Sequence, residues 1–122
     1  MAAELEIGLN PAPGAPMAAR DAVAEALGDS LPPAAVADLQ LIVSELVTNS
    51  VRHGPRREIN LRVSIEESGL IRGEVEDHGE GTVARREMGA EGGYGLHLVD
   101  RLSDRWAVYE GSTHVWFEYS PR

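Results

Sequence analysis

The sequence predicts an α+β fold: a two-layer α/β sandwich whose mixed, mostly antiparallel sheet carries helices on one face. Three observations predict it. Several short runs have the apolar and polar pattern of strands, longer runs place apolar residues at helical spacing, and four strand runs form two pairs joined by short turns. At 122 residues the chain is expected to form one domain, residues 1–122.

The composition excludes several classes of chemistry. The chain has no cysteine, so disulfides, thiolate metal sites and cysteine nucleophiles are ruled out. All 11 basic residues are arginines, which excludes a phosphate-binding or Schiff-base lysine. The net charge of -9 argues against direct nucleic-acid binding. No apolar run is read as long enough to cross a membrane, and no signal peptide is recognised, so we expect a cytoplasmic protein.

The first half of the chain predicts one strand and two helices. Apolar residues alternate in the first ten positions, which indicates a strand, and the proline-rich stretch 10–16 indicates a loop. Met17–Leu27 is alanine-rich and predicts a helix that ends at Gly28. A second helix begins at Ser30 or at the following prolines and stops at Gly54. Its apolar stripe consists of Val36, Leu39, Val43, Leu46, Val47 and Ser50.

The second half predicts two hairpins with a loop and a helix between them. Residues 59–65 and 71–75 alternate as paired strands, and a polar loop is expected over 82–91. A helix is expected over 95–104, followed by strands over 105–110 and 114–120. Trp106 and Trp116 fall in these last strands and are expected in the core.

Glu45 and Asn49 are the first candidates for chemistry. They lie four residues apart, and therefore on a common face of the second helix, offset from its apolar stripe. An asparagine oxygen suits Mg²⁺, and a carboxylate one turn away could accept a proton from a hydroxyl group. The alternative is a solvated polar face with an incidental pair.

Asp77, Gly79 and Gly81 form the second candidate. An aspartate at the end of a strand can accept a hydrogen bond from an adenine amine, and glycines let the backbone approach a flat ring closely. The alternative is an ordinary turn, because aspartate and glycine are common turn residues.

A glycine cluster, Gly92-Gly93-Tyr94-Gly95, precedes the third predicted helix. Amide groups at a helix N-terminus can bind phosphate without lysine. The alternative is a flexible hinge or a simple helix entry. Neither glycine segment completes the dinucleotide-binding pattern G-x-G-x-x-G, so that type of site is not expected.

Together the three segments resemble the boxes of the Bergerat-fold (GHKL) ATPases, and more closely those of the bacterial anti-sigma-factor serine kinases. The matching stretches are 41–54, 77–81 and 92–106, which resemble the N box and the two glycine boxes in the same order. The order of elements matches over nearly the whole chain. Two departures are visible: Ser50 stands where alanine is common, and the loop over 82–91 is short.

The resemblance implies a role for each residue. Asn49 would coordinate Mg²⁺ that bridges the phosphates of ATP, and Glu45 would be the general base. Asp77 would bind the adenine amine, with Gly79 and Gly81 lining the base pocket. The implied phosphate site is formed by Gly93, Gly95 and the amide of Leu96, under a lid formed by residues 82–91.

The resemblance also implies a function. Members of this family are protein serine kinases that phosphorylate a STAS-domain anti-anti-sigma partner, and they sequester a sigma factor when that partner is not available. Family members often form homodimers. Two other readings stay open: a non-catalytic ATP-binding regulatory module, and the catalytic domain of a histidine kinase.

Overall fold

The computed structural model describes residues 3–77, 85–86, 96–109 and 114–121. The described part of the chain forms three helices and six strands in this order: β1 Ala3–Leu9, α1 Ala15–Leu27, α2 Pro33–His53, β2 Ile59–Ile65, β3 Ile71–Glu76, β4 Arg85–Arg86, α3 His97–Leu102, β5 Arg105–Tyr109 and β6 Val115–Tyr119.

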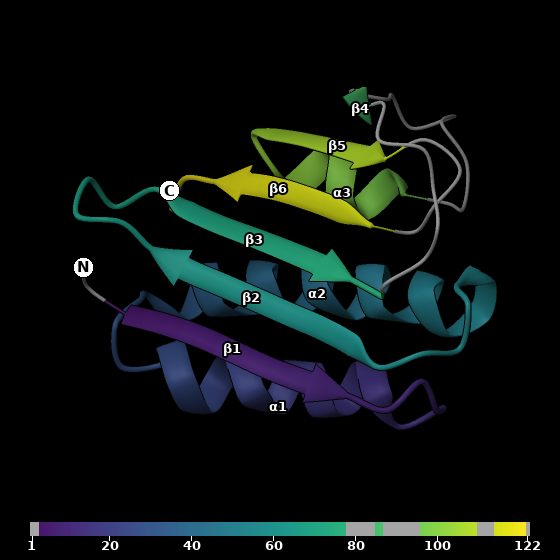
Figure 1. Ribbon diagram of the computed structural model, residues 1–122. Helices are drawn as coiled ribbons and strands as arrows, with labels where there is room; N and C mark the ends of the chain where they lie inside the picture. Colours follow the sequence, from purple (N-terminus) through teal and green to yellow (C-terminus); the bar gives the residue numbers. More distant parts are fainter. Residues whose placement is uncertain (1–2, 78–84, 87–95, 110–113, 122) are drawn as a thin grey trace.

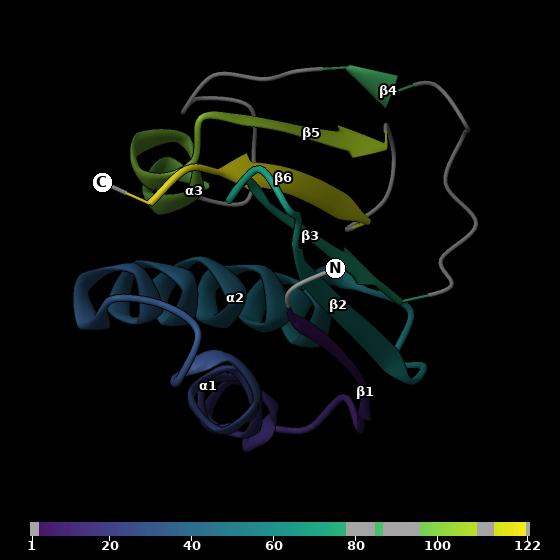
Figure 2. The ribbon, with the colours of Figure 1, turned by 90° about the vertical axis from the view of Figure 1, so that its left-hand side faces the viewer.

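The strands form one sheet with the order β1-β2-β3-β6-β5-β4 (Figure 1). Every strand pair in the described residues is antiparallel. All three helices lie on the same face of this sheet (Figure 2). The prediction of a two-layer α+β fold with helices on one face is therefore confirmed.

The alternation of apolar and polar residues along a strand explains how the sheet packs against the helices. In β2 the buried positions are the apolar Ile59, Leu61, Val63 and Ile65, while Arg62 between them is exposed. Side chains on a strand point alternately to opposite faces, so this pattern buries one face and leaves the other open. The core forms between that buried face and the helices.

α2 is the central helix of this layer. It packs against α1, α3, β2 and β3. By length and composition it is the one described helix that could cross a membrane, which corrects the reading that no apolar run is long enough. Here its apolar stripe, including Leu39, Val43 and Leu46, is buried in the core of the fold.

Three helix boundaries differ from the prediction, and one of them is the start of α3, which is at His97 rather than 95. α1 begins at Ala15 rather than Met17, because Pro16 occupies its first turn, where a missing N–H group costs nothing. α3 ends at Leu102 rather than 104, since Ser103 is extended. The Ser103 hydroxyl donates a hydrogen bond of 2.5 Å to the carbonyl oxygen of Val99 and so closes the last turn.

Two other expectations need correction. Arg85 and Arg86 lie in the stretch predicted to be a loop, yet they form β4 and pair with β5. Trp106 is buried in the core as predicted, but Trp116 is only half-buried. Trp116 pairs with Ala107 rather than Trp106 across β5 and β6, so the alternation of side chains places the two tryptophans on opposite faces of the sheet.

Candidate functional site

α2 supplies the first two predicted site residues, Glu45 and Asn49. Asn49 is only 6% exposed, and Glu45, one turn earlier, is half-buried. A buried side-chain amide without hydrogen-bonding partners is costly, so an asparagine in a core helix indicates a polar neighbour or a ligand. The alternative of a solvated polar face is therefore wrong for Asn49.

Asp77 follows directly after β3. Ile71, Gly73 and Val75 alternate on the buried face of that strand, and Asp77 continues the alternation. Its carboxylate therefore points to the face covered by the helices, and the residue is only 1% exposed. A simple surface turn would leave this carboxylate in solvent, so its burial favours a binding role.

Leu96 directly precedes α3 and is buried. α3 packs against α2 and β5, which holds the start of α3 beside the helix that carries Asn49. The side chain of Leu96 is apolar and buried. The predicted phosphate site therefore depends on the position of the Leu96 backbone.

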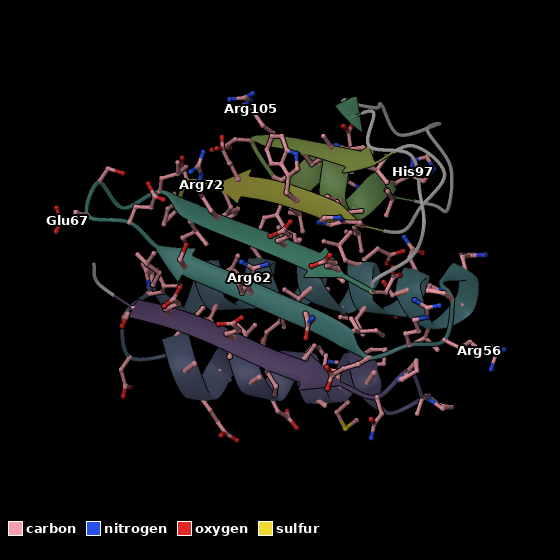
Figure 3. The ribbon with its side chains drawn as sticks, in the orientation of Figure 1. Arg56, Arg62, Glu67, Arg72, His97 and Arg105 are labelled. Carbon is pink, nitrogen blue, oxygen red and sulfur yellow. The ribbon has the colours of Figure 1, made fainter. Side chains whose placement is uncertain are left out.

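These elements meet at one end of the molecule. In Figure 3, Arg56 marks the chain just after α2 and His97 marks the first residue of α3, and both lie at the end to which the β3 arrow points. The structure therefore brings together the last turns of α2, the exit of β3 and the beginning of α3 (Figure 1). These are the elements that carry Asn49, Asp77 and Leu96.

The remaining predicted residues are Gly79, Gly81, Gly93 and Gly95, and all four lie outside the described residues. The same holds for the predicted lid over 82–91, apart from the two residues of β4. Their roles stay predictions.

Sequence reasoning placed Ser50 in the apolar stripe and assigned its hydroxyl no role. In the structure Ser50 is 1% exposed, and its hydroxyl has no hydrogen-bonding partner in the part of the chain that the structure describes. The feature of the sequence that could have drawn attention to this hydroxyl is a serine at an expected core position, directly after Asn49.

The open face of the sheet carries a separate polar hollow of about 470 Å³. In it the guanidinium of Arg72 donates hydrogen bonds of 3.1 Å and 2.9 Å to Glu118. These bonds, together with the charges of Glu118 and Glu66, raise the pKa of Arg72 above its ordinary value. The predicted site residues that the structure describes are Glu45, Asn49, Asp77 and Leu96. None of these four lines the hollow, so it is distinct from the site that they form at α2 and α3.

A metal site made of protein ligands alone is not present in the described ranges. They contain no group of three or more histidine, aspartate or glutamate side chains that could hold a metal ion. Asn49 beside Glu45 fits the different arrangement that Mg²⁺ often takes, with few protein ligands and the remainder from water and substrate phosphates.

A protein-family comparison identifies the fold. The family model of the histidine kinase-like ATPase domain matches residues 10–119. The chain belongs to this family. The resemblance to GHKL ATPases seen in the sequence is thereby confirmed.

Solved structures agree with the assignment of this histidine kinase-like ATPase domain. The crystal structure of the RsbU and RsbW domains of Rv1364c from Mycobacterium tuberculosis superposes with a TM-score of 0.72 and 22% sequence identity. The match covers 98% of this chain but only 32% of that chain, so the domain spans about a third of its length. No curated protein sequence matches the domain. The structural likeness shows the GHKL, or Bergerat, fold.

Proposed function

We propose that this histidine kinase-like ATPase domain is an ATP- and Mg²⁺-dependent protein serine kinase of the anti-sigma type. The observation that carries the proposal is the burial of Asn49 and Asp77 on separate elements that meet beside the start of α3. Buried polar side chains need hydrogen-bonding partners, and polar groups gathered in this way are common at binding sites, where a bound nucleotide would add further partners.

The residues present fit the nucleotide and the metal. The Asp77 carboxylate can accept a hydrogen bond from the exocyclic amine of adenine, and the Asn49 amide oxygen is a hard ligand suited to Mg²⁺. Bound Mg²⁺ would neutralise charge on the phosphates. The backbone amide of Leu96 would hold phosphate at the entry to α3, and Gly93 and Gly95 are proposed to extend that site.

Glu45 is proposed to act on the acceptor substrate. Its carboxylate is half-buried, so it can face both the nucleotide site and a partner at the surface. In this role Glu45 accepts the proton of a serine hydroxyl as the serine oxygen attacks the γ-phosphorus of ATP. The bond to the bridging oxygen breaks, ADP leaves and phosphoserine forms. Such transfer depends mainly on positioning and electrostatics, which a small domain can supply.

The substrate and partners come from the resemblance seen in the sequence. We propose that the acceptor is a serine of a STAS-domain anti-anti-sigma protein, and that a sigma factor is bound when that protein is not available. A cytoplasmic location and a homodimer are consistent with this function and remain parts of the proposal. The RsbW domain in the structurally similar protein supports the same assignment.

The decisive experiment measures transfer of the labelled γ-phosphoryl group from ATP to candidate STAS-domain proteins. Glu45→Ala should abolish transfer while calorimetry still detects ATP binding. Glu25→Ala is the matched control, because Glu25 is an exposed helical glutamate on α1. It should retain full transfer.

Two outcomes would contradict the proposal. Transfer that persists in Glu45→Ala would remove Glu45 from the role of general base. Wild-type protein that binds ATP and captures a sigma factor, but transfers no phosphate, would favour the non-catalytic regulatory module instead.

A further inference from the structure

Two large apolar side chains are exposed in the part of the chain that the structure describes, Met17 on α1 and Leu41 on α2. A single exposed apolar side chain is ordinary on a protein surface. Leu41, however, lies one helical turn before Glu45, and residues four apart are neighbours on a helix. An apolar side chain is therefore exposed beside the carboxylate that is proposed to act on the acceptor serine.

Leu41, Glu45 and Asn49 form one row along α2, at intervals of four residues. Exposure falls along this row: Leu41 is 45% exposed, Glu45 is half-buried and Asn49 is 6% exposed. Such a row drifts around the helix, because four residues make slightly more than one turn. The row therefore runs from solvent into the candidate site, and a protein substrate that reaches Glu45 comes close to Leu41.

The end of α2 is a local basic surface on an acidic protein. Residues 46–57 contain no aspartate or glutamate, although the chain carries a net charge of -9. They contain three arginines, Arg52, Arg56 and Arg57, and all three are exposed. Arg52 lies seven residues after Glu45, close to two full turns, and so on the same side of α2.

Arginines on the open face of the sheet are paired with glutamates; Arg62, for example, lies 3.3 Å from Glu74. Arg52 and Arg56 form no ion pair with the other described residues. A cation in the last turn of a helix interacts favourably with the helix dipole, which explains Arg52 in part but not Arg56, which follows the helix. In Figure 3, Arg56 lies at the end of the molecule where the site elements meet. This basic surface is therefore suited to an acidic group of a partner.

We propose that the flank of α2 formed by Leu41, Glu45 and Arg52 is the docking surface for the acceptor protein. The acceptor presents an apolar side chain to Leu41 and an acidic side chain to Arg52, on opposite sides of its serine. The inference rests on the proposed function, because it describes how the acceptor of the same kinase binds.

The spacing along α2 sets the spacing in the acceptor. A rise of about 1.5 Å per residue places Leu41 about 6 Å and Arg52 about 10 Å from Glu45 along the helix axis. In an extended acceptor segment these distances correspond to about two residues on one side of the serine and about three on the other.

Steady-state phosphoryl transfer to a STAS-domain protein tests the inference, with KM measured separately for the acceptor and for ATP. Leu41→Ala should raise KM for the acceptor about threefold to tenfold, and Arg52→Glu should raise it about tenfold or more, because a reversed charge repels the acidic group. ATP affinity measured by calorimetry should not change. In the wild type KM for the acceptor should rise with salt, and Arg52→Glu should remove most of that rise.

Met17→Ala and Arg101→Glu are the matched controls. Met17 is exposed on α1, and Arg101 is an exposed arginine in the last turn of α3, as Arg52 is in the last turn of α2. Both variants should keep the wild-type KM for the acceptor. An acceptor in which one acidic residue near the serine is changed to arginine should restore a low KM with Arg52→Glu, a rescue that a misfolded variant would not give.

Several results would overturn the inference. An unchanged KM for the acceptor in both Leu41→Ala and Arg52→Glu would show that this flank does not contact the acceptor. A weaker ATP affinity in Arg52→Glu would assign that arginine to the phosphates, and an oligonucleotide that binds the wild type but not Arg52→Glu would assign the basic surface to nucleic acid. Wild-type protein that transfers phosphate to no STAS-domain protein would instead refute the proposed function itself.

Discussion

The ring of Phe117 occupies the space beside Gly73 in which any other residue would place its Cβ atom. A Cβ at Gly73 would lie 2.1 Å from Cζ and 2.2 Å from Cε1 of that ring. The two residues are direct partners across β3 and β6, and Phe117 is fully buried. This close approach fixes β3, which leads into Asp77, against the centre of the core.

Gly73→Ala should therefore destabilise the fold. The added methyl group would force the Phe117 ring or the strand to move, which we expect to cost about 1–3 kcal/mol in the free energy of unfolding. Urea denaturation measures the loss. Gly14→Ala is the control, because no atom lies within 4 Å of a Cβ at Gly14. A Gly73→Ala protein as stable as the control would show that the ring moves aside freely.

Tyr119→Phe tests a bond that joins the sheet to α2. The buried Tyr119 hydroxyl donates a hydrogen bond of 2.6 Å to Oδ2 of Asp38. Its removal should cost about 1–2 kcal/mol of unfolding free energy, as expected for a hydrogen bond to a charged acceptor that retains some access to water. A double-mutant cycle with Asp38→Ala isolates the pair. Strict additivity of the two single changes would mean that the bond contributes nothing.

Asn49→Ala tests the proposed magnesium ligand. Without the amide oxygen, ATP affinity in the presence of Mg²⁺ should fall about tenfold or more, while affinity measured with a chelator should change little. Calorimetry with and without Mg²⁺ gives both values, and an unfolding curve checks that the variant is folded. Equal losses in both conditions would show that Asn49 contacts the nucleotide itself or supports the fold.

Asp77→Asn tests the proposed contact with adenine. The change removes the negative charge that strengthens a hydrogen bond from the amine, so ATP affinity should fall about tenfold to a hundredfold. Asp29→Asn, at an exposed position after α1, should bind ATP like the wild type. If Asp77→Asn also bound normally, the base would have to lie elsewhere.

Much of the fold could be predicted from local patterns. The alternation in β2 and β3 and the long apolar stripe of α2 each depend on residues close together in the chain, and all appear in the structure. The ends of α1 and α3 were less predictable. Pro16 follows other loop-forming residues yet suits a first helical turn, and the hydroxyl of Ser103 closes α3 early.

The candidate site, like the fold, has some features that the sequence predicts and others that only the structure shows. The types of Glu45, Asn49 and Asp77 and their order along the chain are enough to indicate nucleotide chemistry. Their burial and their meeting at one end of the molecule depend on how α2, β3 and α3 pack. Those contacts join residues far apart in the sequence, so a pattern of apolar and polar residues within one segment cannot predict them.

The sequence by itself determined the three helices and every described strand except β4, because periodicity and turn residues act over a few positions. It also determined the family, through three short segments in a specific order. Only the tertiary structure decided that Trp116 lies on the open face, that the Ser50 hydroxyl is left without a partner in the described residues, and that Phe117 lies against Gly73. Each of these depends on which distant elements surround a side chain, and strand pairing and helix packing alone set those surroundings.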